Sequence, residues 1–227
     1  MRGASAGSGG VFSSIISGSY DRMELFPALA LLELESVAVG IRVTDAMVKR
    51  APIAQLKFGT VHPGHFLVLV GGSVASVEEA FDAGLAAGGP RIRDCIFLPD
   101  VHPSVYRSAH GERNECRNDT VGILETTSVA GLLGAADAAV KGTDVSIVEL
   151  RMADDLGGKA FVIFTGELAE IQSALEIGGA RIPSGRLHGK TIVPRLDDSV
   201  RSMVTSGTIF NSCTPYRPEG AELHETR

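Results

Sequence analysis

The segment Thr60–His65, read TVHPGH, contains residue types that can bind a metal or transfer protons. His62 and His65 lie three positions apart around a Pro-Gly pair. Neutral imidazole is a ligand for zinc, copper and nickel, and it titrates between pH 5 and 8. One chain supplies only two histidines here, whereas catalytic zinc sites use three protein ligands and structural sites four. The segment is therefore a candidate metal site, a candidate active site or a polar bend.

Two pairs elsewhere combine a nucleophile with a base, namely Ser73 with His62 and Cys95 with His102. Neither pair is accompanied by a third, orienting group or by a nucleophile-elbow motif. The stretch Leu69–Ser73, LVGGS, runs from an apolar segment into glycines but lacks both G-x-G-x-x-G and a Walker lysine. We therefore expect that the chain is not an enzyme.

Composition narrows the class of protein. The 227 residues are 44% hydrophobic and 21% charged, which is typical of a folded globular chain. The formal charge of -6 argues against nucleic acid as a partner, because binding phosphates requires a basic surface. Three widely spaced cysteines without a C-x-x-C pair favour a reducing cytoplasm. The early apolar patch at 11–16 is too short to span a membrane.

The chain contains an internal repeat. Residues 32–49, LELESVAVGIRVTDAMVK, align with residues 124–141, LETTSVAGLLGAADAAVK, at an offset of 92. Nine of the eighteen aligned residues are identical. The match resumes after a loop at an offset of 94, where HFLVLVGG from His65 lies over KAFVIFTG from Lys159. Two copies of one unit therefore make up most of the chain.

Each copy predicts the same order of elements. An apolar strand (28–34; 120–125) is followed by a helix, a strand pair, a second helix and a final strand that ends at a proline. Ser76 and Glu79 have the spacing of a capping box for the second helix of the first copy. The unit is thus β-α-β-β-α-β, an α+β ferredoxin-like sandwich with a four-stranded antiparallel sheet and helices on one face.

The remaining segments connect or flank the copies. We expect the first domain at 28–105, a polar linker at 106–118 and the second domain at 119–204. Residues 1–27 and 205–227 are interpreted as flexible tails, since they lack the periodicity of a buried element.

The two strand-helix segments resemble the L-E-T…D-A-x-x-K signature that opens bacterial microcompartment shell domains, called BMC domains. With LPDVHPSV and VPRLDDSV at the ends of the copies, the resemblance covers residues 28–204. Both copies begin with the signature, so the chain is similar to the tandem, non-permuted, trimer-forming class, above all to trimeric shell proteins of propanediol-utilisation compartments. This resemblance implies a structural, self-assembling homotrimer, or pseudohexamer, that tiles with hexameric and pentameric shell proteins within the cytoplasm.

The resemblance also implies sites. A lysine at the end of the signature helix and an arginine after the last strand make edge contacts between tiles in the family, which assigns Lys49, Lys141 and Arg195 to that role. The first copy has Asp100 where the arginine is expected.

The loop between the second and third strands lines the central pore of the family. The implied pore residues are Thr60, Val61, His62, Pro63, Gly64, His65, Asp154 and Asp155, and they would pass small polar metabolites. Propanediol-utilisation members carry an iron–sulfur cluster on a cysteine of this loop. His62 occupies that position here, so we expect no cluster and no other cofactor, while a three-fold ring of His62 side chains could hold a metal ion.

A second class of function fits the same architecture. A trimeric sensor or electron-transfer protein would use the histidines on the three-fold axis to bind a metal or a small molecule. Sheets or shells seen by electron microscopy would favour the tile, and discrete trimers that respond to one ligand would favour the sensor.

Overall fold

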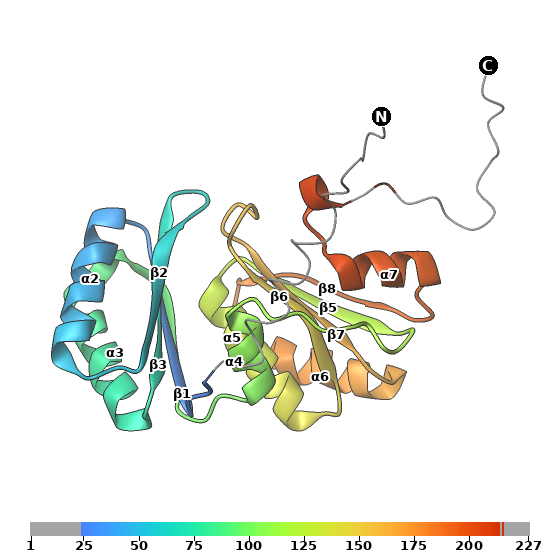
Figure 1. The fold of residues 1–227 in the computed structure, drawn as a ribbon, viewed down its shortest axis with the longest axis horizontal. Helices are drawn as coiled ribbons and strands as arrows, with labels where there is room; N and C mark the ends of the chain where they lie inside the picture. Colours follow the sequence, from blue (N-terminus) through green and yellow to red (C-terminus); the bar gives the residue numbers. More distant parts are fainter. Residues whose placement is uncertain (1–23, 214, 216–227) are drawn as a thin grey trace, which may run out of the picture.

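The computed structural model describes residues 24–213 and 215, which form two similar units side by side (Figure 1). The first copy contains β1 (Ala28–Leu34), α2 (Val37–Arg50), β2 (Gln55–Val61), β3 (His65–Gly72), α3 (Val74–Gly88), a 3-10 turn (Gly89–Arg91) and β4 (Ile92–Leu98). The second contains β5 (Val121–Thr126), α5 (Val129–Gly142), β6 (Ser146–Met152), β7 (Ala160–Thr165), α6 (Leu168–Arg181) and β8 (Leu187–Val193). Helix α4 (Pro103–Ala109) follows the first copy, and α7 (Asp198–Ser206) with a 3-10 turn (Phe210–Ser212) follows the second.

The two sheets have the same topology. Their strand orders are β2-β3-β1-β4 and β6-β7-β5-β8, and every pair is antiparallel. Even the register shift recurs, between Glu33 and Leu34 in one copy and between Glu125 and Thr126 in the other. The predicted fold of two non-permuted, four-stranded units is confirmed.

Strand pairing makes each position of one copy equivalent to a position of the other. Glu33 pairs with Asp94 and Glu125 pairs with Gly189, so the final strands and the segments after them correspond at an offset of 95. Phe58 of β2 is likewise equivalent to Leu150 of β6, because their partners Val68 and Val162 are equivalent. These equivalences allow the surroundings of the two copies to be compared residue by residue.

Serine caps position the first-copy helices. Ser36 accepts a hydrogen bond from the N–H of Val39 at the start of α2, which satisfies one free donor of the first turn. Helix α3 begins at Val74 with Ser73 as its cap, so the predicted capping box of Ser76 and Glu79 was wrong. The chain turns into the helix three residues earlier, directly after β3.

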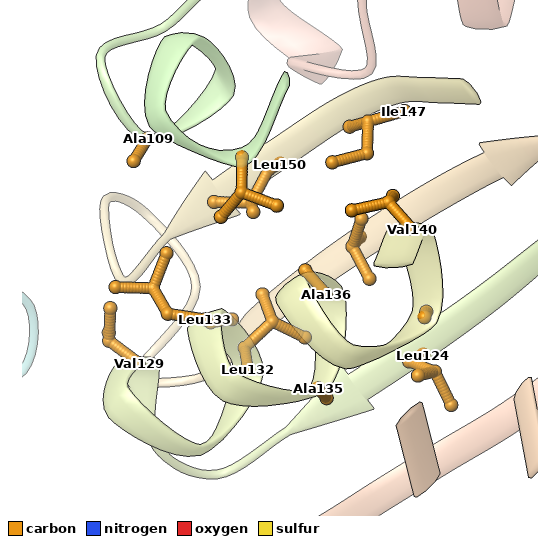
Figure 2. Close-up of a cluster of buried hydrophobic side chains, with 14 of the residues drawn as sticks. Ala109, Leu124, Val129, Leu132, Leu133, Ala135, Ala136, Val140, Ile147 and Leu150 are labelled. Carbon is orange, nitrogen blue, oxygen red and sulfur yellow. The ribbon is translucent and has the colours of Figure 1, made fainter. Parts of the chain in front are cut away.

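The two faces of the first sheet are covered by different copies. Helices α2 and α3 cover one face, which forms a core with Ala30, Leu32 and Val68. The opposite face, with Leu29 and Leu31, belongs to a cluster that continues into the second copy. Figure 2 shows the part of this cluster around α5, with Leu132 and Leu133. Helix α5 packs against β4 and β1 there, besides packing on its own sheet. The two copies therefore share one hydrophobic core, and this contact is called the copy junction below.

Close packing at the copy junction depends on a glycine of α5. A Cβ added to Gly134 would lie 2.7 Å from Cδ1 of Ile96 on β4, closer than real contacts allow. A side chain at this position would require Ile96 to move, so the glycine allows α5 and β4 to pack closely.

The second sheet has helices α5 and α6 on one face and the C-terminal segment on the other. The outer face carries Val121, Val148 and Ile163, which pack against Leu196 and Val204 from the segment that contains α7. Figure 1 shows α7 lying over this sheet, away from the first copy.

Residues predicted to form the linker are partly helical and buried. Helix α4 contains the first four of them, and Tyr106 is fully buried with its hydroxyl donating to Gln55 of β2. Phe26, within the predicted N-terminal tail, packs edge-on against the Tyr106 ring. The segment is thus part of the core of the copy junction, and a count of polar residues missed this because its few apolar residues all point inward.

The predicted C-terminal tail begins inside a helix. Thr205 and Ser206 belong to α7, and Thr208 donates to the carboxylate of Glu149 at 2.8 Å. Residues 205–213 therefore lie against the second copy. The rest of this prediction, at 214 and 216–227, and the N-terminal prediction for residues 1–23 lie outside the described residues.

Candidate functional site: the hairpin loops and the copy junction

The two hairpin loops, β2–β3 and β6–β7, lie next to each other on one side of the molecule (Figure 1). His62 Nδ1 is 3.7 Å from Asp155 Oδ1, and both side chains are largely exposed. The backbones are also close, since a Cβ added to Gly158 would lie 3.1 Å from Pro63. The two loops occupy equivalent places between the second and third strands of their copies, and together they present an imidazole and a carboxylate to solvent.

The predicted pore residues divide into two groups. Thr60, Pro63, Gly64 and Asp154 are exposed like His62 and Asp155, and Val61 is half-buried at the end of β2. His65 instead turns inward, with Nδ1 3.2 Å from Oε1 of the buried Glu33. Within the described residues of one chain, no group of three or more His, Cys, Asp or Glu side chains is arranged to hold a metal ion.

Sequence reasoning missed Glu33, the charged residue at the centre of the copy junction. Its side chain is fully buried on β1. Oε1 lies 3.1 Å from Arg93 Nε and close to His65, and Oε2 accepts a hydrogen bond of 3.1 Å from the N–H of Val129. Val129 is the first residue of α5, so the carboxylate of one copy receives the helix N-terminus of the other. This arrangement is favourable because the N-terminal end of a helix carries partial positive charge.

Burial raises the pKa of Glu33, while the hydrogen bond from Val129 and the charges of Arg93 and His65 oppose that shift. Removal of one partner would therefore leave the carboxyl in a site that disfavours its charged form. A signal for this residue existed in the sequence, because the same glutamate interrupts an apolar strand in both copies, at 33 and 125.

The equivalent carboxylate of the second copy has a different environment. Glu125 Oε1 lies 2.6 Å from Lys159 Nζ and 3.9 Å from His188 Nε2. These basic residues are equivalent to His65 and Arg93, but the Glu125 side chain is 34% exposed. Among the described residues, no helix N-terminus donates to it. The second copy thus contains the same acidic position without the helix that covers it in the first.

The predicted edge residues are separate from the loops. Lys49 is exposed at the end of α2 and pairs with Asp45, one turn earlier, at 2.7 Å. Lys141 is more restricted, because its ammonium contacts Asp137 at 2.7 Å and donates to the backbone carbonyl of Asp100. Arg195 is exposed and adopts a left-handed backbone conformation with φ of 54°. Lys141 and Asp100 therefore meet across the copy junction, whereas Lys49 has no such contact within the described chain.

Comparisons with known proteins place this arrangement in a family. The model of the BMC domain matches residues 28–100 and 120–196. The chain belongs to the BMC-domain family. It is 34% identical over 181 residues to the bacterial microcompartment shell protein PduT of Citrobacter freundii, covering 79% of this chain and 98% of the relative. It is thus a tandem BMC shell protein of a bacterial microcompartment.

Solved structures agree with this assignment. A microcompartment protein from Desulfitobacterium hafniense matches with a TM-score of 0.70 and 34% identity, over 78% of this chain and 99% of that one. The double ringed trimeric shell protein of the RMM microcompartment matches with a TM-score of 0.52 over 69% of this chain and 83% of that one; its 16% identity supports the fold alone. Within the described residues, no helix combines the length and apolar character needed to cross a bilayer.

Proposed function

We propose that three chains close into a ring of six BMC domains that acts as a shell tile with a central pore. One observation carries this proposal: apolar residues that are exposed in one copy are equivalent to residues buried at the copy junction in the other. The copy junction joins the first domain to the second within a chain. A closed ring repeats that contact between the second domain of each chain and the first domain of the next.

The signature helices show the pattern most clearly. Ile41 on α2 is 57% exposed, whereas the equivalent Leu133 on α5 is fully buried. Val37 and Val48 are also exposed, and their equivalents Val129 and Val140 are buried in the shared core. The apolar stripe of α5 packs against the first sheet, so the stripe of α2 is suited to pack against the outer face of the second sheet of another chain.

The pattern continues beyond the helices. Phe58 of β2 is 53% exposed, while the equivalent Leu150 of β6 is buried. Val200 of α7 is 45% exposed, while the equivalent Val105 of α4 is fully buried. Exposed apolar side chains on three elements of matching position favour a specific partner surface over scattered surface residues. A second copy of the chain offers the surface that fits them.

The proposed pore follows from the same symmetry. The adjacent hairpin loops of three chains would place three His62 and three Asp155 side chains alternately around one axis, with Thr60 and Asp154 beside them. An opening with both signs of charge suits small polar metabolites, and it requires no catalytic group. The three His62 imidazoles could also hold a metal ion, whereas the loop offers no thiolate for an iron–sulfur cluster.

Lys49 and Arg195 are the residues proposed to contact neighbouring shell proteins at the tile edge. Both are exposed in the described structure. Lys141 is proposed for the same role, with its orientation already set by Asp137 and Asp100. Hexameric and pentameric shell proteins are the proposed partners, because a flat tile needs neighbours to close a shell.

Light scattering after gel filtration and electron microscopy at high protein concentration test this function together. We expect a trimer at low concentration and extended sheets at high concentration. Lys49→Asp should abolish the sheets and leave the trimer intact, and Lys190→Asp provides a matched change at an exposed lysine of β8. A monomer at all concentrations would contradict the ring, and sheets that persist in the Lys49 variant would contradict the edge assignment.

A small-molecule sensor is the second candidate, favoured by a hollow of about 180 Å³ beside the loops. Leu31, Leu67 and Leu69 form its apolar lining, and Lys57 and Asp154 provide charge. Discrete trimers that never form sheets, together with saturable binding of one metabolite, would favour this function over the tile.

A further inference from the structure

The copy junction contains a helix N-terminus seated on a buried carboxylate. The N–H of Val129 donates to Glu33, and the cap residue Ser128 donates to Asp94 beside it. Arg93 adds a hydrogen bond of 3.1 Å to the carbonyl of Thr127, just before the helix. These contacts fix the start of α5 on the first sheet, so they set the relative orientation of the two domains.

The two halves of an equivalent contact are both present elsewhere in the chain, but apart from each other. Glu125 lies at the position equivalent to Glu33, partly exposed and flanked by Lys159 and His188. Val37 begins α2 at the position equivalent to Val129, and Ser36 caps that helix as Ser128 caps α5. Among the described residues, nothing accepts a hydrogen bond from the N–H of Val37.

We infer that Glu125 of one chain accepts a hydrogen bond from the N–H of Val37 in the next chain. The inference rests on the proposed ring, and it adds the polar contact that fixes the angle between chains. Apolar packing of Ile41 and Phe58 would bury surface area but would not fix the orientation of the helix, because apolar burial is non-directional. A carboxylate that faces a helix N-terminus favours one position of the helix on the sheet. The site is incomplete within one chain because, among the described residues, Glu125 and the N–H of Val37 make no contact with each other.

The interchain contact differs from the contact within the chain in two ways. Gly189 occupies the position of Asp94, so the cap residue Ser36 has no side-chain acceptor there. Lys159 and His188 replace His65 and Arg93 as the cationic neighbours of the carboxylate. Glu125 is therefore the only side-chain carboxylate that the equivalent positions provide for the arriving helix, and the contact should depend on it.

Val37→Pro removes the donor selectively. Proline is well accepted at the first position of a helix, and it lacks an N–H. The preceding Ser36 has φ of −139° and ψ of 124°, the extended conformation that proline requires before it. Helix α2 should therefore form normally in the variant. Val37→Ala serves as the control, because it removes the same apolar side chain and keeps the N–H.

Glu125→Gln removes the acceptor charge, and Glu176→Gln on the exposed face of α6 is its matched control. We expect Val37→Pro and Glu125→Gln each to weaken assembly of the trimer by about tenfold or more, as for loss of a hydrogen bond to a charged group. The double variant should be no more than about threefold weaker than either single variant, since both remove the same contact. Sedimentation velocity over a concentration series measures these constants.

The outcomes separate the contact from the ring. A wild-type chain that stays monomeric would overturn the proposed function, and the contact with it. A wild-type trimer in which both variants assemble within about threefold of their controls would overturn the contact and leave the ring standing. Fully multiplicative effects in the double variant would also overturn it, because Glu125 and Val37 would then act at separate places.

Discussion

The two BMC domains have the same backbone fold, but different elements cover the outer faces of their sheets. The face of the first sheet is buried under α4 and α5, within one core that crosses the copy junction. The face of the second sheet carries α7 and a separate cluster around Val148 and Ile163. Equivalent residues therefore have opposite exposure, although they lie on the same elements.

This difference is the basis for the proposed partner surface, because residues buried in one domain are equivalent to exposed apolar residues of the other. Leu133 and Ile41 have the same place on equivalent helices, so their unequal exposure cannot result from the fold of a single domain. It results from the presence of a neighbouring domain on one side only. The same reasoning applies to Glu33 and Glu125, one covered by a helix N-terminus and the other partly exposed.

The largest expected effect comes from placing one substitution at both equivalent positions. Leu133→Asp buries a carboxylate in the shared core and should destabilise the chain by about 5 kcal/mol or more, enough to unfold it. Ile41→Asp should leave the unfolding free energy of the isolated chain within about 0.5 kcal/mol of wild type. It should nevertheless abolish the trimer, because the carboxylate would be buried on assembly. Circular dichroism in denaturant and light scattering measure the two quantities.

A trimer that survives Ile41→Asp would show that α2 is an ordinary exposed helix. The exposed apolar residues of the first copy would then not mark an interface between chains. Ile41→Leu, which copies the residue of α5, is the matched control and should assemble like wild type.

The next effect concerns the contacts that hold α7 against the second sheet. Arg113 pairs with the buried Glu149 and donates to the carbonyl of Val204 at 2.7 Å. These contacts join the segment between the two copies to α7. Arg113→Met should destabilise the chain by about 2–4 kcal/mol, because the carboxylate loses its nearest partner. Arg151 remains 3.9 Å away and reduces the loss. Chemical denaturation measures the change.

Arg107→Met is the control for this prediction. Arg107 lies 3.9 Å from Glu112 and is more exposed, so its loss should change stability by less than about 0.5 kcal/mol. Equal effects of the two substitutions would mean that α7 covers the second sheet without needing the buried ion pair.

The smallest effect is a pH dependence assigned to the copy junction. Burial lowers the pKa of His110, which follows α4, stacks on the Tyr106 ring and contacts its carbonyl through Nδ1. The unfolded chain then binds more protons below about pH 6.5, so stability should fall as the pH drops from 6.5 through the lowered pKa. His110→Phe keeps a ring against Tyr106 and should flatten this slope. Thermal melts between pH 5 and 7.5 test it, and an unchanged slope would assign the effect elsewhere.

The fold could be predicted from the sequence because the repeat states it twice. The offset of 92 that aligns Lys49 with Lys141 also aligns the first strands, the later strands follow at offsets of 94 and 95, and strand order follows from the family resemblance. Segments without a repeat were predicted less well. Tyr106 and Thr208 lie in polar stretches that were interpreted as a linker and a tail, yet both side chains make contacts that no local pattern encodes.

The candidate site was only partly visible in the sequence. The loops containing His62 and Asp155 could be paired through the repeat, and they do lie together. The inward turn of His65 could not be predicted, because its partner Glu33 lies on a strand more than thirty residues away. The available signal was a charged residue on an apolar strand, repeated at Glu125, but the sequence does not show that a helix N-terminus covers Glu33.

The connection between the two domains has a consequence for how a ring would form. Because Tyr106 and α4 are built into the copy junction, the two domains of a chain meet without a bimolecular encounter. A ring assembled from three such chains gives up the translational and rotational freedom of two bodies, because the ring keeps that of one, whereas six separate domains would lose that of five. At about 4 kcal/mol or more for each body that is immobilised, the fused chain would close rings at concentrations too low for single domains.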